Sequence, residues 1–230
     1  MTGEADFRTP ISQLEKEVTQ KREKIWYASY GSNLNFQRFR CYIEGGTPPG
    51  STHTNPGCRD KTPPSDRRPI SLNFELYFAG NSAVWKGAPA FIRDGGRSAL
   101  ALGRMYLITD DQFNDVVMQE NDQEVSGARF IPSFEELMRK DKFELPGDRL
   151  YGHVLRIGEQ DGWPVITFTT KKVLTINAPS KAYIKVIVAG LKDTYPAMTN
   201  AQICEYLLRA EGVHGHMSPE ELADWVSEKL

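Results

Sequence analysis

The chain has 230 residues, of which 40% are hydrophobic and 25% charged, and its formal net charge at pH 7 is −2. This length and hydrophobic content allow one sizeable core, so we expect a single domain with extensions. The nearly balanced charge excludes the broad basic surface that recruits nucleic acid. We therefore expect a small-molecule ligand and no nucleic-acid partner.

The cysteine content and the hydropathy of the chain indicate which cellular compartment to expect. Cys41, Cys58 and Cys204 form an odd set without a CxxC pair, which argues against a disulfide framework and a structural zinc site. Residues 1–23 are charged and lack the apolar core of a signal peptide, and no later apolar run is long enough to cross a bilayer. We expect a soluble, cytoplasmic protein without membrane partners, and we leave open whether it forms a homodimer.

The first third of the chain predicts a polar arm, a strand and a long loop. Residues 1–23 carry only a thin apolar stripe, so we interpret them as an arm that is helical at most. The β-branched and aromatic residues of 24–30 predict a strand, and residues 31–33 supply turn and capping residues before a helix. Residues 45–69 are crowded with Gly, Pro, Ser and Thr, which predicts a surface loop near the site.

The remainder of the chain predicts strands in the middle and helices at the end. Strands are expected where apolar and polar residues alternate, at 71–80, 88–94 and 101–109, with two more within 147–170. Helices are expected where N-cap residues precede a helical spacing, at 110–120, 180–193, 199–212 and 218–230. The order predicts an α+β fold with a small mixed or antiparallel, barrel-like sheet, flanking helices and C-terminal helices.

The first predicted strand stops abruptly at Gly31-Ser32-Asn33. A glycine followed by two short polar residues at the start of a helix exposes several backbone N–H groups, which can hold a carboxylate or a developing oxyanion. Because helix caps are common, these three residues are equally compatible with a plain cap. The tripeptide alone does not decide between the two interpretations.

Five segments in order along the chain resemble the γ-glutamylcyclotransferase family. The first is YGSNL, which looks like the family's signature at the end of its first strand. The others are LNFELYFAGNSAVWKGAPAFI, GRMYLIT, DDQFNDVVMQEN and APSKAYIKVIVAGLKDTYP. The resemblance covers about residues 24–196 and implies the catalytic domain of that family there. Residues 1–23 would then be a polar arm, and residues 197–230 a helical extension packing on the same domain.

The resemblance also implies a reaction. Members of the family cleave a γ-glutamyl amide by attack of the substrate's own α-amine on its γ-carbonyl, releasing 5-oxoproline and an amine or amino acid. The protein must supply a bent substrate, a base and oxyanion donors, and no metal or cofactor is needed. Glu120 matches the family's catalytic glutamate, and partial desolvation at the end of an apolar helix would raise its pKa and suit it to acid and base work.

Further residues are implied to bind the substrate. The backbone of the turn would hold the α-carboxylate or the oxyanion, and a tyrosine that matches one in the family's pocket would lie beside it, although a core tyrosine is an equally good interpretation. These residues are Tyr30, Gly31, Ser32, Asn33, Leu34 and Tyr183.

The chain also departs from the family pattern. Ala88 and Asn121 stand where the family usually has glycine, and the segment 45–69 is longer than in compact members. Within it, Arg59 could bind a substrate carboxylate through its fork of donors, or simply pair with a surface aspartate. Two alternatives therefore stay open: removal of a γ-glutamyl group from a specialised metabolite, and a non-catalytic small-ligand binding protein on the same fold.

Overall fold

A computed structural model describes residues 23–48, 51, 53–96 and 99–228. Six strands form one mixed sheet in the order β2-β5-β1-β8-β7-β6, in which β1 and β8 are parallel and the other neighbours antiparallel. A separate antiparallel pair is formed by β3 and β4. The strands are β1 (Lys24–Ser29), β2 (Asp66–Leu72), β3 (Glu75–Phe78), β4 (Ala90–Arg93), β5 (Ala101–Thr109), β6 (Lys142–Glu144), β7 (His153–Gln160) and β8 (Trp163–Thr169).

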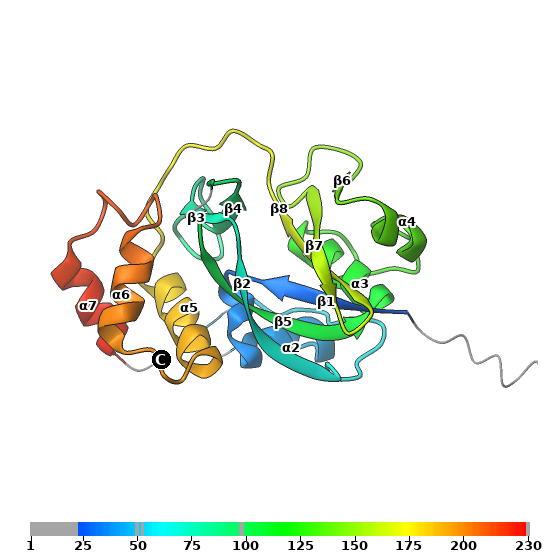
Figure 1. The fold of residues 1–230 in the computed structure, drawn as a ribbon, viewed down its shortest axis with the longest axis horizontal. Helices are drawn as coiled ribbons and strands as arrows, with labels where there is room; N and C mark the ends of the chain where they lie inside the picture. The colour runs from blue at the N-terminus through cyan, green and yellow to red at the C-terminus, as the bar shows by residue number, and fades with distance from the viewer. Residues whose placement is uncertain (1–22, 49–50, 52, 97–98, 229–230) are drawn as a thin grey trace, which may run out of the picture.

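Helices cover both faces of the sheet (Figure 1). In that view α5, α6 and α7 lie on the left of the sheet, and α3 and α4 lie on its right. The helical elements are the short 3₁₀ turn η1 (Ser32–Leu34), α2 (Phe36–Glu44), α3 (Asp110–Glu120), α4 (Phe134–Arg139), α5 (Lys181–Thr194), α6 (Asn200–Leu208) and α7 (Pro219–Ser227). Among the described residues, no helix combines the length and the apolar character needed to span a membrane.

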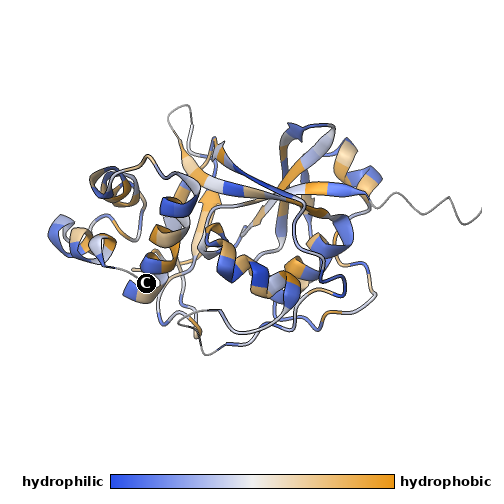
Figure 2. Ribbon diagram, turned by 90° about the horizontal axis from the view of Figure 1, so that it is seen from below, coloured by the Kyte–Doolittle hydropathy of each residue, from blue (hydrophilic) through white to orange (hydrophobic). Residues whose placement is uncertain are grey.

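The central strand β1 is buried on both sides. Trp26 and Ala28 belong to a core cluster with residues of α5, α6 and α7, whereas Ile25 and Tyr27 belong to a second cluster with residues of α2, α3 and α4. Alternate side chains of a strand point to opposite faces, so one strand contributes to two cores. Figure 2 shows hydrophobic residues along the central strands, with hydrophilic stretches on the helices around them.

The α+β prediction, with a mixed sheet, flanking helices and C-terminal helices, is confirmed. The helix caps are also as predicted: Thr109, Ser180 and Ser218 each accept a hydrogen bond from a backbone N–H in the first turn of the following helix. The sheet is curled, and an open hollow of about 220 Å³ lies between residues of its edge strand β2 and residues of β6 and β7. In the hydrogen-bonded order of the sheet, β2 and β6 are the edge strands, so the sheet is barrel-like but not closed.

Three elements differ from the expectation. Residues 66–69 were assigned to the long loop but begin β2, an edge strand whose charged residues and Pro69 suit a position with one open edge. The short elements α4 and β6 were not predicted. Helix α4 carries a capping box between Ser133 and Glu136. It has only six residues, too few for a helical spacing of apolar residues to be recognised in the sequence. The predicted polar arm lies outside the described residues except at Glu23.

Candidate functional site

The turn that ends β1 faces a narrow pocket of about 30 Å³. It is lined by Tyr27, Tyr30, Gly31, Ser32, Asn33, Ala90, Glu120, Tyr151, Phe168 and Tyr183. The structure thus brings Glu120 and Tyr183 together with the first part of the YGSNL turn.

Glu120 is the acidic residue of the pocket. It is the last residue of α3, and its Oε1 accepts a hydrogen bond of 2.8 Å from Asn33 Nδ2. The Tyr42 hydroxyl lies near this carboxylate. Burial raises the pKa of Glu120 above its ordinary value of 4.5, whereas the nearby Arg38, the hydrogen bond from Asn33 and the Tyr42 hydroxyl act in the opposite direction. A carboxylate with a raised pKa can both take up and return a proton.

The backbone of the turn leaves some amides without a partner. The N–H of Leu34 donates to the carbonyl of Gly31 at 3.0 Å, so that amide is already used. For the N–H groups of Ser32 and Asn33, no acceptor is found in the part of the chain that the structure describes. Of the backbone amides predicted to bind an anion, those of Ser32 and Asn33 are therefore available in the pocket that Glu120 also lines. The amide of Leu34 is not, and the side chain of Leu34 is fully buried in the core.

The side chain of Asn33 is a second open polar group. It is 4% exposed, and its Nδ2 also reaches the hydroxyl of Tyr27 at 3.3 Å. Its Oδ1 is buried and has no hydrogen-bond partner among the described residues. A buried acceptor without a donor is costly, and such groups in a pocket wall indicate a place for a ligand N–H.

Two tyrosines hold the turn in place. The hydroxyl of Tyr30 donates to the carbonyl of Phe168 on β8 at 2.8 Å, which fixes the end of β1. The hydroxyl of Tyr183 accepts from the N–H of Ala90 at 3.2 Å. A Cβ atom at Gly31 would lie 3.1 Å from this hydroxyl, so the glycine permits the close approach of the turn to Tyr183.

Tyr151 is a pocket residue that the sequence analysis missed. It follows an irregular segment, and Asn121 holds that segment on α3: Asn121 Oδ1 accepts from the Tyr151 N–H at 3.0 Å, and its Nδ2 donates to the Tyr151 carbonyl at 3.3 Å. The same Nδ2 donates to Val117 O at 3.0 Å. Asn121, which stands where the family usually has glycine, therefore holds Tyr151 and with it one wall of the pocket in place. This clamp on Tyr151 is visible only in the three-dimensional fold.

Arg38 is a second residue that the sequence analysis did not place. It lies on α2 and is only 5% exposed. Its Nε donates to Ser32 Oγ at 2.9 Å, and its guanidinium lies 4.6 Å from the ring of Trp85. Trp85 in turn packs on Tyr183 with ring centroids 4.6 Å apart. A buried cation thus lies directly behind the pocket turn.

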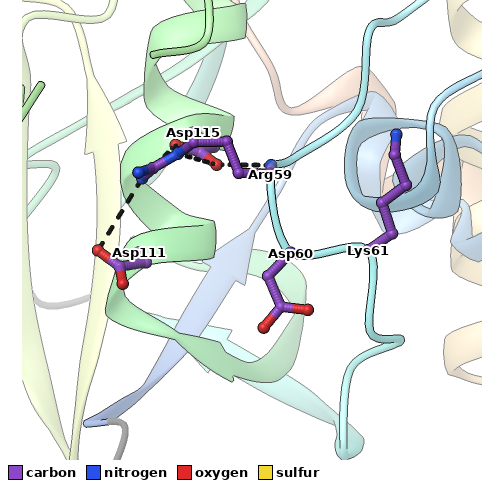
Figure 3. Close-up of a pocket in the computed structure, with 5 residues that line it drawn as sticks. All are labelled: Arg59, Asp60, Lys61, Asp111 and Asp115. Atoms are coloured by element: carbon purple, nitrogen blue, oxygen red, sulfur yellow. Dashed lines mark hydrogen bonds and ion pairs between the residues drawn. The ribbon is translucent and has the colours of Figure 1, made fainter. Parts of the chain in front are cut away.

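Arg59 is not brought to this pocket. Its guanidinium and its own N–H bond to the carboxylate of Asp115 on α3, and Asp111 lies 4.0 Å away (Figure 3). These residues line a separate, open hollow of about 510 Å³, in which the side chains of Asp60 and Lys61 point away from Arg59 (Figure 3). Within the described residues, no group of three or more His, Cys, Asp or Glu side chains is arranged to hold a metal ion.

No protein-family model matches this chain. A curated relative named histone deacetylase 5, from Arabidopsis thaliana, is 31% identical over 185 residues, which are 74% of this chain and 28% of the relative. The chain therefore spans less than a third of the length of the relative it matches.

Similar solved structures have low sequence identity to this chain. One described as an uncharacterised human protein and one described as a gamma-glutamyl cyclotransferase each have 16% identity and a TM-score of 0.49. The first covers 90% of this chain and 99% of its own length, and the second covers 89% and 98%. A yeast structure, described as a gamma-glutamyl cyclotransferase specific to glutathione, has 12% identity and a TM-score of 0.34, covering 89% of this chain and 96% of its own.

Proposed function

We propose that this chain is a γ-glutamylcyclotransferase-like enzyme that converts a γ-glutamyl amide into 5-oxoproline and a free amine or amino acid. The substrate's α-nitrogen forms a bond to its own γ-carbonyl carbon, and the γ-amide C–N bond breaks. Two protons leave the α-ammonium, one before and one after the attack, and both end on the departing nitrogen, which leaves as an ammonium, so no water and no oxidant are consumed. The protein's task is to bend the substrate, transfer these protons and stabilise one oxyanion.

The residues of the pocket are matched to these tasks. Glu120 is the base that accepts the two protons of the α-ammonium in turn and passes each to the leaving nitrogen. Asn33 Oδ1, which lacks a donor, accepts a hydrogen bond from the same ammonium and orients it. The free N–H groups of Ser32 and Asn33 bind the oxyanion of the tetrahedral intermediate, while Tyr30 and Tyr183 keep the turn close.

One observation carries the proposal most directly. The 2.8 Å bond from Asn33 Nδ2 to Glu120 Oε1 puts a carboxylate of raised pKa against the turn in which, among the described residues, the N–H groups of Ser32 and Asn33 have no acceptor. Residues 87 positions apart in the sequence thus combine a base and oxyanion donors in one small pocket. A structural carboxylate would be expected to face a paired cation or solvent instead.

The test is to incubate the purified protein with a panel of γ-glutamyl amino acids and γ-glutamyl amines and to follow 5-oxoproline by mass spectrometry. We expect 5-oxoproline and the matching amine in equal amounts, and the best substrate names the leaving group. If a folded protein binds γ-glutamyl ligands without releasing 5-oxoproline, the non-catalytic alternative is supported and the enzymatic proposal fails.

The name of the Arabidopsis relative does not supply a second function for this chain. The aligned part is 28% of that protein, so deacetylation by the whole protein is not transferred. The described part of loop 45–69 does not line the Glu120 pocket, so the loop gives no support to a bulky metabolite as substrate.

A further inference from the structure

Arg38 lies at the back of the pocket turn and retains unused donors. Its Nε donates to Ser32 Oγ at 2.9 Å, and its Nη2 donates to the hydroxyl of Tyr42 at 3.4 Å. A guanidinium has five N–H donors, so three of them have no partner among the described residues. Ser32 lines the pocket, and both Tyr42 and Arg38 act on the carboxylate of Glu120, which places the cation next to the turn and near the base.

The charge of Arg38 is not balanced by a close carboxylate. No Asp or Glu oxygen of the described residues lies within 4.0 Å of its guanidinium, although this side chain is 5% exposed. Buried charges in proteins are normally paired, because leaving water costs each ion several kcal/mol. The aromatic contacts at 4.6 Å with Trp85 and 5.6 Å with Tyr42 cover the faces of the guanidinium but supply no anion.

The imbalance grows during the reaction. Glu120 becomes neutral when it takes up the ammonium proton, and burial raises the pKa of Tyr42 and Tyr183, so both stay protonated. Arg38 then has no negative partner among the described groups around it. A γ-glutamyl substrate carries the missing charge, since its α-carboxylate is attached to the same carbon as the α-amine that Glu120 deprotonates.

We propose that Arg38 is the residue that requires a free α-carboxylate on the substrate, which it binds beside Ser32 while Glu120 and Asn33 hold the α-nitrogen. This inference rests on the proposed function, whose product 5-oxoproline already carries a free α-carboxylate, and it assigns the residue that recognises this group. The opposite charges of Arg38 and Glu120 then match the two charges of the amino-acid head group, and the turn amides are left for the oxyanion.

The experiment compares two substrates in two proteins. The substrates are γ-glutamyl methylamide and its analogue in which the α-carboxylate is a carboxamide; methylamine is the leaving group of both, and it carries no carboxylate. In the wild type we expect kcat/KM for the carboxylate substrate to exceed that for the carboxamide by about 10- to 100-fold, the range of a charge-assisted hydrogen bond. In Arg38→Met this preference should fall to about twofold or less.

Control variants separate recognition from folding. Arg40 lies on the same helix and pairs with Glu44 at the surface, so Arg40→Met should keep the wild-type preference. Arg38→Lys keeps the charge without the fork and should recover part of the preference. If Arg38→Met lowers kcat/KM equally for both substrates, Arg38 acts only through folding or through the pKa of Glu120, and the inference is overturned.

The inference can fail without the proposed function failing. A wild type that releases methylamine equally from both substrates is a cyclotransferase that does not read the α-carboxylate. If no substrate is turned over, calorimetric titration with 5-oxoproline and 5-oxoprolinamide tests Arg38 on its own. Wild-type preference for 5-oxoproline that is absent in Arg38→Met supports the inference, and equal binding of both lactams by the wild type contradicts it.

Discussion

Helix α3 carries a buried carboxylate, Asp115, and a partly buried one, Glu120, with different surroundings. Asp115 is 1% exposed and is held by Arg59, with bonds of 2.9 Å from both the backbone N–H and Nη2. Glu120, at the end of the same helix, accepts a hydrogen bond from the side-chain amide of Asn33 and lies near the Tyr42 hydroxyl, and its nearby Arg38 is not within ion-pair distance. The first pair is satisfied by the chain itself, whereas the second arrangement is short of an anion. The larger hollow belongs to the first, so size does not identify the site.

The largest expected effect separates the two carboxylates by activity. Glu120→Gln should lower kcat for 5-oxoproline release by about 10²- to 10⁴-fold, the range of a lost general acid and base. Asp115→Asn keeps the shape of its side chain outside the pocket and should leave kcat within about twofold. Steady-state assays of both variants, with circular dichroism to verify folding, decide the matter. Equal activity of Glu120→Gln and wild type would remove Glu120 from the mechanism.

The pair of Arg59 and Asp115 should show the reverse pattern, with an effect on stability alone. Arg59→Met leaves the buried Asp115 carboxylate with only a backbone donor from residue 59 and should lower the free energy of unfolding by about 1–2 kcal/mol. Asp111→Asn is the matched control, because Asp111 is 63% exposed and 4.0 Å away, and it should change stability by less than about 0.5 kcal/mol. Urea unfolding measures both.

The activity of Arg59→Met tests the position of the loop. Because the structure holds Arg59 on Asp115 and outside the Glu120 pocket, kcat/KM under conditions where the variant is folded should stay within about twofold of wild type. A loss of tenfold or more, confined to substrates whose leaving group has a carboxylate, would mean that the loop moves to the substrate. That result would restore the role that the sequence predicted for Arg59.

The difference between the two regions also explains what the sequence could predict. The strand at 24–30 and the helix at 110–120 followed from local periodicity and from the cap at Thr109, and their ends bring the turn to Glu120. Arg38 and Arg59 look alike in the sequence, since both follow polar or glycine-rich segments. Whether an arginine meets a carboxylate depends on a contact 56 residues away for Arg59, and periodicity has no information on such contacts.

Tyr151 and Asn121 were missed for the same reason. The segment before Tyr151 has no strand or helix pattern, and Asn121 seemed only a departure from glycine. Its side chain connects the end of α3 to both backbone groups of Tyr151. A signal of this kind is visible only when helix ends and loops are considered together in three dimensions.

The clamp on Tyr151 predicts a moderate effect. Asn121→Gly removes three side-chain hydrogen bonds and adds backbone freedom, so the wall over Glu120 should loosen. We expect KM to rise about three- to tenfold while kcat changes less than threefold, since the base and the turn are untouched. Gln123→Ala is the control, because among the described residues the side chain of Gln123 hydrogen-bonds only to the carbonyl of Asn121. A fall in kcat with unchanged KM would contradict a wall function.

The smallest effect is on stability as a function of pH, and its sign follows from the raised pKa of Glu120. A carboxyl group whose folded-state pKa is raised stabilises the fold fully below its unfolded-state pKa, and this contribution is lost as the pH rises through the folded-state pKa. Glutamine does not titrate, so Glu120→Gln should gain melting temperature relative to wild type as the pH increases from about 4.5 to 8, with the difference smallest at the acid end. Asp115→Asn should show no such gain at neutral pH, because it loses a paired carboxylate. If the Glu120→Gln difference is flat across this pH range, Glu120 is solvated like a surface acid, and the contrast between the two carboxylates of α3 disappears.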